Sequence, residues 1–100
     1  MKKRFLKSKP VCKVTFELPA QAANGTASVT IAGEFNGWDS AATPMKRGKG
    51  GAYSVTLDLP GGREYQFRYL IDGKRWENDW AADKYVHSPF GDGENSVVVT

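Results

Sequence analysis

Short stretches in which apolar and polar residues alternate recur along this chain, roughly every ten residues, the spacing typical of sandwiches and barrels. The clearest is 52–59, where every second residue from Tyr53 to Leu59 is apolar. Alternation of this kind gathers the apolar side chains on one face of a strand, because successive strand residues point to opposite faces. No window shows sustained helical spacing. The pattern therefore predicts a chain built from β-strands.

Turn-forming residues separate these stretches. We expect strands over 11–18, 28–35, 52–59, 64–71, 75–77 and 95–100. Asp72-Gly73 is a strong hairpin signal, whereas 80–90 is predicted to be a long connection, since Pro89 argues against a strand there. Many short strands with turns between them predict an all-β protein, and an Ig-like antiparallel β-sandwich fits the length best.

Length and composition allow one domain. The chain has 100 residues, 40% of them hydrophobic, which is enough for one modest core. No apolar run approaches the ~18 residues of a transmembrane helix. The lone cysteine, Cys12, excludes the disulfide-bonded form of the Ig sandwich. A buried free thiol fits a reducing compartment, so we expect a cytoplasmic protein.

The positive charge is concentrated at the start of the chain. Six cations precede the first acid, Glu17, and from Glu17 onward the chain has eight Lys and Arg against eleven Asp and Glu. We therefore expect residues 1–10 to form a basic flexible N-terminal arm and 11–100 to form the single domain. Such an arm is either a solvated leader or a contact for nucleic acid, a membrane surface or an acidic partner. Its only apolar pair is Phe5-Leu6, so it does not resemble a signal peptide.

Three tryptophans lie in polar, turn-rich stretches. Trp38 follows Asn-Gly, and Trp76 and Trp80 lie among charged residues and asparagine. A tryptophan in such surroundings often keeps one face in solvent, and a flat exposed ring suits a sugar ring or a nucleobase. Partly buried packing is the alternative for each of the three, because tryptophan is highly buried on average.

Catalytic and metal-binding signatures are absent from the sequence. The only histidine, His87, is adjacent to Ser88, and neighbouring residues of an extended chain point apart rather than converge. Asp79 and Asp83 could be neighbours, but a small domain has little room for the cleft of a glycosidase, and turn hydrogen bonds are the simpler role for them. Because no Cys/His cluster, calcium loop or phosphate-binding loop is present, we expect no metal or cofactor. The sequence indicates a binding protein, not an enzyme.

Several segments together carry a resemblance that runs in order from about Val11 to Thr100. They are Gly-Glu-Phe-Asn-Gly-Trp at 33–38, Leu-Asp-Leu-Pro-Gly at 57–61, Tyr-Gln-Phe-Arg-Tyr-Leu-Ile-Asp-Gly at 65–73, Trp76, and Asn-Ser-Val-Val-Val at 95–99. The chain resembles the starch- and glycogen-binding modules of isoamylase and glycogen branching enzymes, and the glycogen-binding domain of the AMP-activated kinase β subunit. The resemblance implies an early-set Ig-like sandwich that binds α-1,4-linked glucan without catalysis, here as a stand-alone module.

The resemblance also implies a set of binding residues. Trp38 and Trp76 would stack on glucose rings, and Arg68 and Asn95 would hydrogen-bond sugar hydroxyls. Phe90 would correspond to a leucine of the family's late loop, although that loop is one residue longer in this chain. The implied partner is an α-glucan polysaccharide or oligosaccharide, with a glycogen-metabolising enzyme or another protein as a further partner. We expect no membrane or nucleic-acid partner, because the chain is acidic after residue 13.

The face on which Trp76 lies depends on the preceding turn. A two-residue turn at Asp72-Gly73 would set Trp76 opposite Tyr69, on the inward face. A loop one residue longer would set it opposite Leu70, on the face of Arg68. Trp80 is the alternative second platform; we favour Trp76, because its spacing to Asp79 matches the family. A module that has lost sugar binding and keeps only protein contacts is the alternative function.

Overall fold

The computed structural model describes residues 1–8, 10–23, 25–89, 91 and 93–100. Within them the strands and one 3₁₀ turn follow in this order: β1 (Lys2–Phe5), β2 (Val11–Leu18), β3 (Val29–Gly33), η1 (Glu34–Asn36), β4 (Lys46–Arg47), β5 (Tyr53–Pro60), β6 (Glu64–Ile71), β7 (Arg75–Glu77), β8 (Lys84–His87) and β9 (Glu94–Val99). This described part contains no α-helix, and therefore no helix long and apolar enough to cross a membrane.

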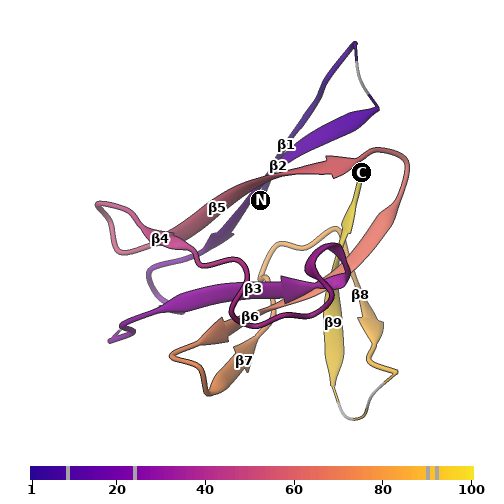
Figure 1. The fold of residues 1–100 in the computed structure, drawn as a ribbon. Helices are drawn as coiled ribbons and strands as arrows, with labels where there is room; N and C mark the ends of the chain where they lie inside the picture. Colours follow the sequence, from indigo (N-terminus) through magenta and orange to yellow (C-terminus); the bar gives the residue numbers. More distant parts are fainter. Residues whose placement is uncertain (9, 24, 90, 92) are drawn as a thin grey trace.

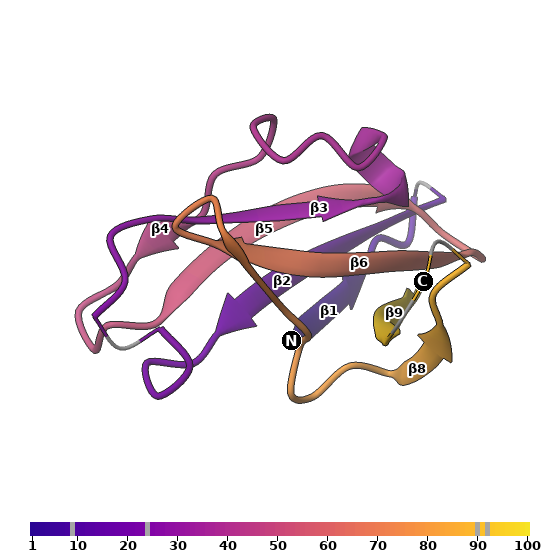
Figure 2. The same cartoon turned by 90° about the horizontal axis from the view of Figure 1, so that it is seen from below.

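The strands form two antiparallel sheets that lie face to face as two layers (Figures 1 and 2). One sheet has the order β1-β2-β5-β4, and the other has the order β3-β6-β9-β8, with β7 also paired to β6. β6 is bordered by β3 on one edge and by β9 and β7 on the other. The prediction of an all-β, Ig-like antiparallel sandwich is confirmed.

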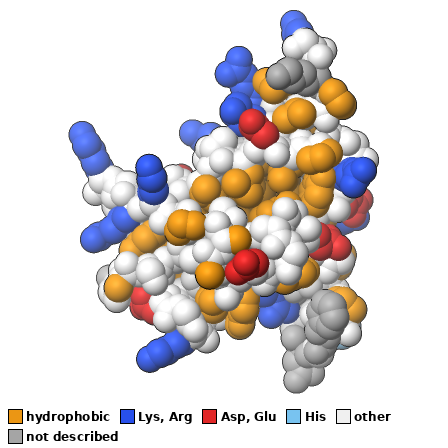
Figure 3. All heavy atoms as spheres, in the orientation of Figure 1, with side chains coloured by type: hydrophobic (Ala, Val, Ile, Leu, Met, Phe, Trp, Pro, Cys, Tyr) orange, Lys and Arg blue, Asp and Glu red, His pale blue; other side chains and the backbone are white. Residues whose placement is uncertain are grey.

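The core lies between the layers and is filled by the alternating apolar residues of β2 and β6. Phe16, Phe67 and Tyr69 are fully buried, and the rings of Phe16 and Phe67 meet edge to face, 4.9 Å between centroids. Apolar side chains are visible between the layers, with Lys and Arg around them at the periphery (Figure 3). Leu70 is predicted to face outward and has only 8% of its surface exposed, because Thr30 and Trp76 flank it on the outer face.

Three strands differ from the sequence-based prediction. The strand expected over 28–35 ends at Gly33, where η1 begins. β4 lies in the stretch between the strands expected over 28–35 and 52–59, and β8 lies inside the predicted connection 80–90. Both form because a neighbouring strand offers backbone partners: β4 pairs with β5 and β8 pairs with β9. Their own sequences show little alternation, so a local pattern could not reveal them.

The basic start of the chain also differs from expectation. Where a flexible arm was expected within residues 1–10, β1 pairs with β2 through four residues. The ammonium of Lys3 crosses to the other sheet and donates to Asp83 Oδ2 at 2.6 Å and to the carbonyl of Val99 at 3.0 Å. Backbone pairing and this side-chain contact together hold the segment against the sandwich.

The buried carboxylate of Asp79 connects the chain after β7 to the core beside β6. Asp79 is 3% exposed and accepts a hydrogen bond from the Tyr69 hydroxyl at 2.6 Å. Its backbone N–H donates to the hydroxyl of Ser96 at 2.9 Å. Burial raises the pKa of Tyr69, and the negative charge of Asp79 raises it further, so the phenol remains a donor at all ordinary pH values. The chain after β7 is thereby fixed to the core.

We predict that Tyr69→Phe lowers the free energy of unfolding by about 2–3 kcal/mol, since it leaves a buried carboxylate oxygen without its donor. Urea denaturation measures the change. Tyr65→Phe is the matched control: its hydroxyl lies 3.4 Å from the Pro60 carbonyl, which also accepts from Thr100 at 2.7 Å. Equal losses in the two variants would contradict the prediction.

The contact between Lys3 and Asp83 should make stability depend on pH. Burial alone would raise the pKa of Asp83, but the hydrogen bonds from Lys3 and from the Val99 N–H outweigh it, and the pKa is lowered. A lowered folded-state pKa stabilises the fold above the unfolded value, about 3.9, and this contribution is lost as the pH falls through the folded value.

We predict that Asp83→Asn unfolds more easily than the wild type at pH 7, by about 0.5–1 kcal/mol. The difference should shrink on acidification, as the pH falls from the unfolded-state pKa through the lowered folded-state pKa and the wild-type carboxylate also becomes neutral. Chemical denaturation across this pH range gives both quantities. Asp58→Asn is the control, because the Lys13–Asp58 pair is more exposed; a loss at pH 7 that persists unchanged in acid would refute the electrostatic origin.

Candidate functional site

The outer face of the β6 sheet carries the polar and aromatic residues that the sequence analysis selected. Arg68 points outward because its neighbours Phe67 and Tyr69 are buried in the core. Trp76 lies on β7 and Asn95 on β9, both beside β6. Residues from three strands are therefore brought to one face by the pairing of the sheet.

The hairpin between β6 and β7 decides the position of Trp76. Ile71 pairs with Arg75 and Leu70 pairs with Trp76, so three residues, Asp72 to Lys74, form the loop. Asp72 and Gly73 have positive φ values, 53° and 67°, and the Asp72 carboxylate accepts the N–H groups of Ala27 and Ser28. The longer-loop register is confirmed: Trp76 lies on the face of Arg68 and is 46% exposed.

Trp38 reaches the same face by a different route, through a tight turn after β3. Gly33 is needed where the turn begins, because a Cβ there would lie 2.6 Å from the Gln66 carbonyl oxygen. The Asn36 side chain accepts from the Gly33 N–H and donates to the Ile31 carbonyl and to the Thr43 hydroxyl. Gly37 and Trp38 then both adopt left-handed φ values, 67° and 60°.

A left-handed conformation is uncommon for a bulky residue and costs of order 1–3 kcal/mol. The Trp38 N–H compensates in part by donating to the Gly33 carbonyl at 2.9 Å. The Asn36 hydrogen bonds hold the other side of the turn. The half-buried indole is therefore fixed by the backbone on which it stands and not by packing in the core.

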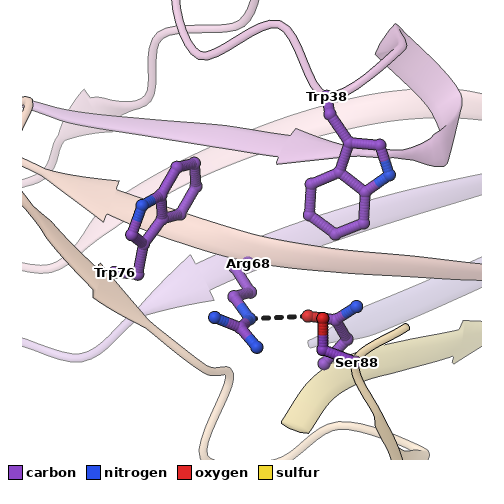
Figure 4. A pocket seen from close by; sticks show the side chains of 5 residues that line it. Trp38, Arg68, Trp76 and Ser88 are labelled. Carbon is purple, nitrogen blue, oxygen red and sulfur yellow. Dashed lines mark hydrogen bonds between the residues drawn. The ribbon is translucent and has the colours of Figure 1, made fainter. Parts of the chain in front are cut away.

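One open cavity of about 390 Å³ joins these residues. Among the residues that the structure describes, Trp38, Arg68, Trp76, Ser88 and Asn95 line it. In the view of Figure 4 the two indoles lie to either side of Arg68, and its guanidinium points away from them toward Ser88. Four of the five residues selected from the sequence thus lie around one cavity. Ser88 was not selected, because no alternation or motif marks the stretch before Pro89 as part of a site.

The guanidinium of Arg68 is fixed by an amide. Its Nε donates to Asn95 Oδ1 at 2.6 Å, and Asn95 Nδ2 donates to Gln66 Oε1 at 2.9 Å. A guanidinium carries five donors in a planar fork, so the bond at Nε leaves the terminal nitrogens as donors for a ligand. The cavity therefore combines two flat apolar surfaces with a fixed, charged hydrogen-bond donor.

The remaining residues considered from the sequence are Phe90, Trp80 and His87. Phe90 lies outside the described residues. Trp80 is 56% exposed but does not line the cavity, and neither does His87. Within the described residues, no group of three or more His, Cys, Asp or Glu side chains could hold a metal ion.

Comparison with known families agrees with the geometry of the cavity. The model of the family described as the glycogen recognition site of AMP-activated protein kinase matches residues 12–100. No match was found among curated proteins. The matched range contains every described residue that lines the cavity, β2 from its second residue, and all of β3 to β9. The chain belongs to the family of the glycogen recognition site of AMP-activated protein kinase.

Proposed function

We propose that the cavity lined by Trp38, Arg68 and Trp76 binds α-1,4-linked glucan, as glycogen, starch or a maltooligosaccharide, without catalysis. The observation that carries the proposal is that two indoles flank one arginine in a single open cavity. Membership of a glycogen-recognition family supports the same ligand class.

Stacking supplies the affinity in this proposal. The axial C–H groups of glucose make one face of the ring apolar, and an indole that covers this face removes apolar area from water. For ~40–80 Å² at ~25 cal/mol/Å², each platform contributes about 1–2 kcal/mol. Trp38 and Trp76 stand on different strands and loops, so two sugar units of one chain can each meet a ring.

Hydrogen bonding supplies the orientation. The terminal nitrogens of Arg68 can donate to two neighbouring hydroxyl oxygens of one sugar, a geometry that the planar guanidinium favours. Asn95 and Ser88 border the same cavity. After the entropy of association is subtracted, little free energy remains for a short oligosaccharide, so its affinity is micromolar to millimolar. A polymer offers repeated sites, and avidity raises the apparent affinity.

The finer assignments rest on the resemblance and belong to the same proposal. They are an early-set Ig-like module of the isoamylase type, a glucan-binding domain over 11–100, a further contact from Phe90, and a protein partner such as a glycogen-metabolising enzyme. A cytoplasmic location is supported by Cys12, which is buried and free.

The proposal is tested by titration with maltoheptaose and β-cyclodextrin, followed by tryptophan fluorescence and NMR shifts, with cellohexaose as control. Saturable changes at the Trp38 and Trp76 indoles with the α-linked sugars alone would support it. A flat response to all three sugars would overturn it and would favour a module that has kept only protein contacts.

We predict that Trp76→Ala weakens maltoheptaose binding by about 1–2 kcal/mol, the value of one stacking platform. The fold should be unaffected, because the ring is 46% exposed. Trp80→Ala is the matched control: this residue is 56% exposed, lies only four residues away, and is outside the cavity. A larger loss in Trp80→Ala than in Trp76→Ala would move the second platform to Trp80.

We predict that Arg68→Ala weakens binding by roughly 1–2 kcal/mol, the scale of a lost charged hydrogen bond. Arg63→Ala, which removes an exposed cation from the β5–β6 turn, should leave affinity unchanged. Isothermal titration at several salt concentrations measures both variants. Neutral-sugar binding should vary little with salt, because no phosphate is neutralised and no counterions are released. Equal affinities of Arg68→Ala and the wild type would show that Arg68 does not contact the sugar.

A further inference from the structure

Three polar side chains form a continuous line across β6 and β9 on the outer face. Arg68 Nε donates to Asn95 Oδ1, and Asn95 Nδ2 donates to Gln66 Oε1. Gln66 and Arg68 are two residues apart on β6, so they point to the same side of the sheet. Asn95 bridges them from the neighbouring strand. Arg68 and Asn95 line the cavity, whereas Gln66 does not.

The arginine determines which atoms donate and which accept in these two hydrogen bonds. A guanidinium has donors and no acceptor, so the atom of Asn95 that faces Nε must be the oxygen. The amide nitrogen of Asn95 must then face Gln66, which has to present its own oxygen. Reversing either amide would set donor against donor or acceptor against acceptor. Gln66 therefore stabilises the one orientation of Asn95 that accepts from Arg68.

Asn95 has little surface to offer a ligand. It is 2% exposed, its side-chain oxygen accepts from Arg68, and one hydrogen of its side-chain nitrogen is given to Gln66. The resemblance implies that this asparagine hydrogen-bonds sugar hydroxyls directly. The observed contacts fit a different task, which is to hold the guanidinium of Arg68 in place.

We infer that Gln66 is a positioning residue of the glucan site and that Asn95 acts through Arg68 rather than as a direct sugar contact. The inference rests on the proposed function. Gln66 fixes the amide of Asn95, Asn95 fixes Nε of Arg68, and the terminal nitrogens of Arg68 are held in the cavity that the two indoles also line. Order established before binding reduces the side-chain entropy that association would otherwise cost.

The backbone on either side of the line adds to the same restraint. The Gln66 N–H donates to Glu34 Oε1 at 2.6 Å, and this contact ties β6 to η1, from which the Trp38 turn departs. Gly93 closes the opposite side: a Cβ there would lie 3.5 Å from Arg68 Nη2, and its φ is +89°. The guanidinium is thus bounded by the loop before β9 as well as by Asn95.

The first test exchanges Gln66 for residues of similar length. Gln66→Met removes the acceptor and should weaken maltoheptaose binding roughly three- to tenfold, the effect of one neutral hydrogen bond. Gln66→Glu keeps an acceptor oxygen and should restore most of the affinity. Gln21→Met, at an exposed glutamine of another loop, is the control and should bind as the wild type does. Equal affinity of Gln66→Met and the wild type would overturn the inference.

A spectroscopic readout follows Arg68 directly. In the free wild-type protein the Nε–H signal of Arg68 should be shifted and slow to exchange, because the proton is held by Asn95. Gln66→Met should move this signal towards the value of a solvated arginine, and Gln66→Glu should not. An unchanged signal in Gln66→Met would contradict the relay from Gln66 to Arg68.

Variants of Asn95 distinguish a role in positioning Arg68 from a direct hydrogen bond to the sugar. In Asn95→Asp the carboxylate still accepts from Arg68 Nε, and Gln66 can turn its amide to donate, so affinity should stay closer to the wild type than that of Asn95→Leu. If the Asn95 nitrogen instead donates to the sugar, both variants should lose binding alike, which would refute the positioning role. If the wild type binds no glucan, the proposed function fails, while the Arg68 Nε–H signal still supports or overturns the relay.

Discussion

Strand β6 is paired on both edges, and the alternation of its side chains links the core to the site. Phe67 and Tyr69 are buried between the sheets, and Arg68 projects from the opposite face. A shift of one residue in strand pairing would exchange these faces. β3, β9 and β7 each pair with β6 in a defined register, so the burial of the aromatic core also determines where Arg68, Trp76 and Asn95 meet.

The two tryptophans that line the cavity are held by backbone hydrogen bonds and not by the core. Trp38 stands on consecutive left-handed residues that Asn36 stabilises, and Trp76 stands on a short strand after a loop bonded through Asp72. Both rings keep exposed surface while their backbones are constrained. A site built in this way loses little order when a flexible sugar chain binds, which matters where each contact is weak.

Exposure alone does not define the site. Trp80 is more exposed than Trp76, and the backbone around it is also fixed, since the Ala81 N–H donates to the Asp79 carboxylate. Asp79, buried against Tyr69, belongs to the contacts that attach this part of the chain to the core, whereas Trp76 is one residue of a cavity shared with Arg68. The two tryptophans therefore differ in their neighbours: Trp76 lies in a cavity with side chains from other strands, and Trp80 does not. The pairing of the strands in the sheet brings these side chains together.

Much of the fold followed from period-two alternation, because that pattern reports burial on one face without knowledge of the partner strand. The inward faces of β2 and β6 and the all-β class were predicted in this way. The same pattern could not reveal β1, β4 or β8, which are strands because β2, β5 and β9 offer them backbone partners.

The candidate site, like the fold, was predicted from the sequence only in part. The sequence by itself determined which residue types could contact a glucan, because Trp38, Arg68, Trp76 and Asn95 stand in recognisable motifs. Only the tertiary structure decided that the β6–β7 loop has three residues and sets Trp76 beside Leu70, that Ser88 joins the cavity, and that Asn95 is bonded between Gln66 and Arg68. The physical reason is that hairpin register and cross-strand hydrogen bonds depend on residues far apart in the chain, whereas alternation and motifs are local.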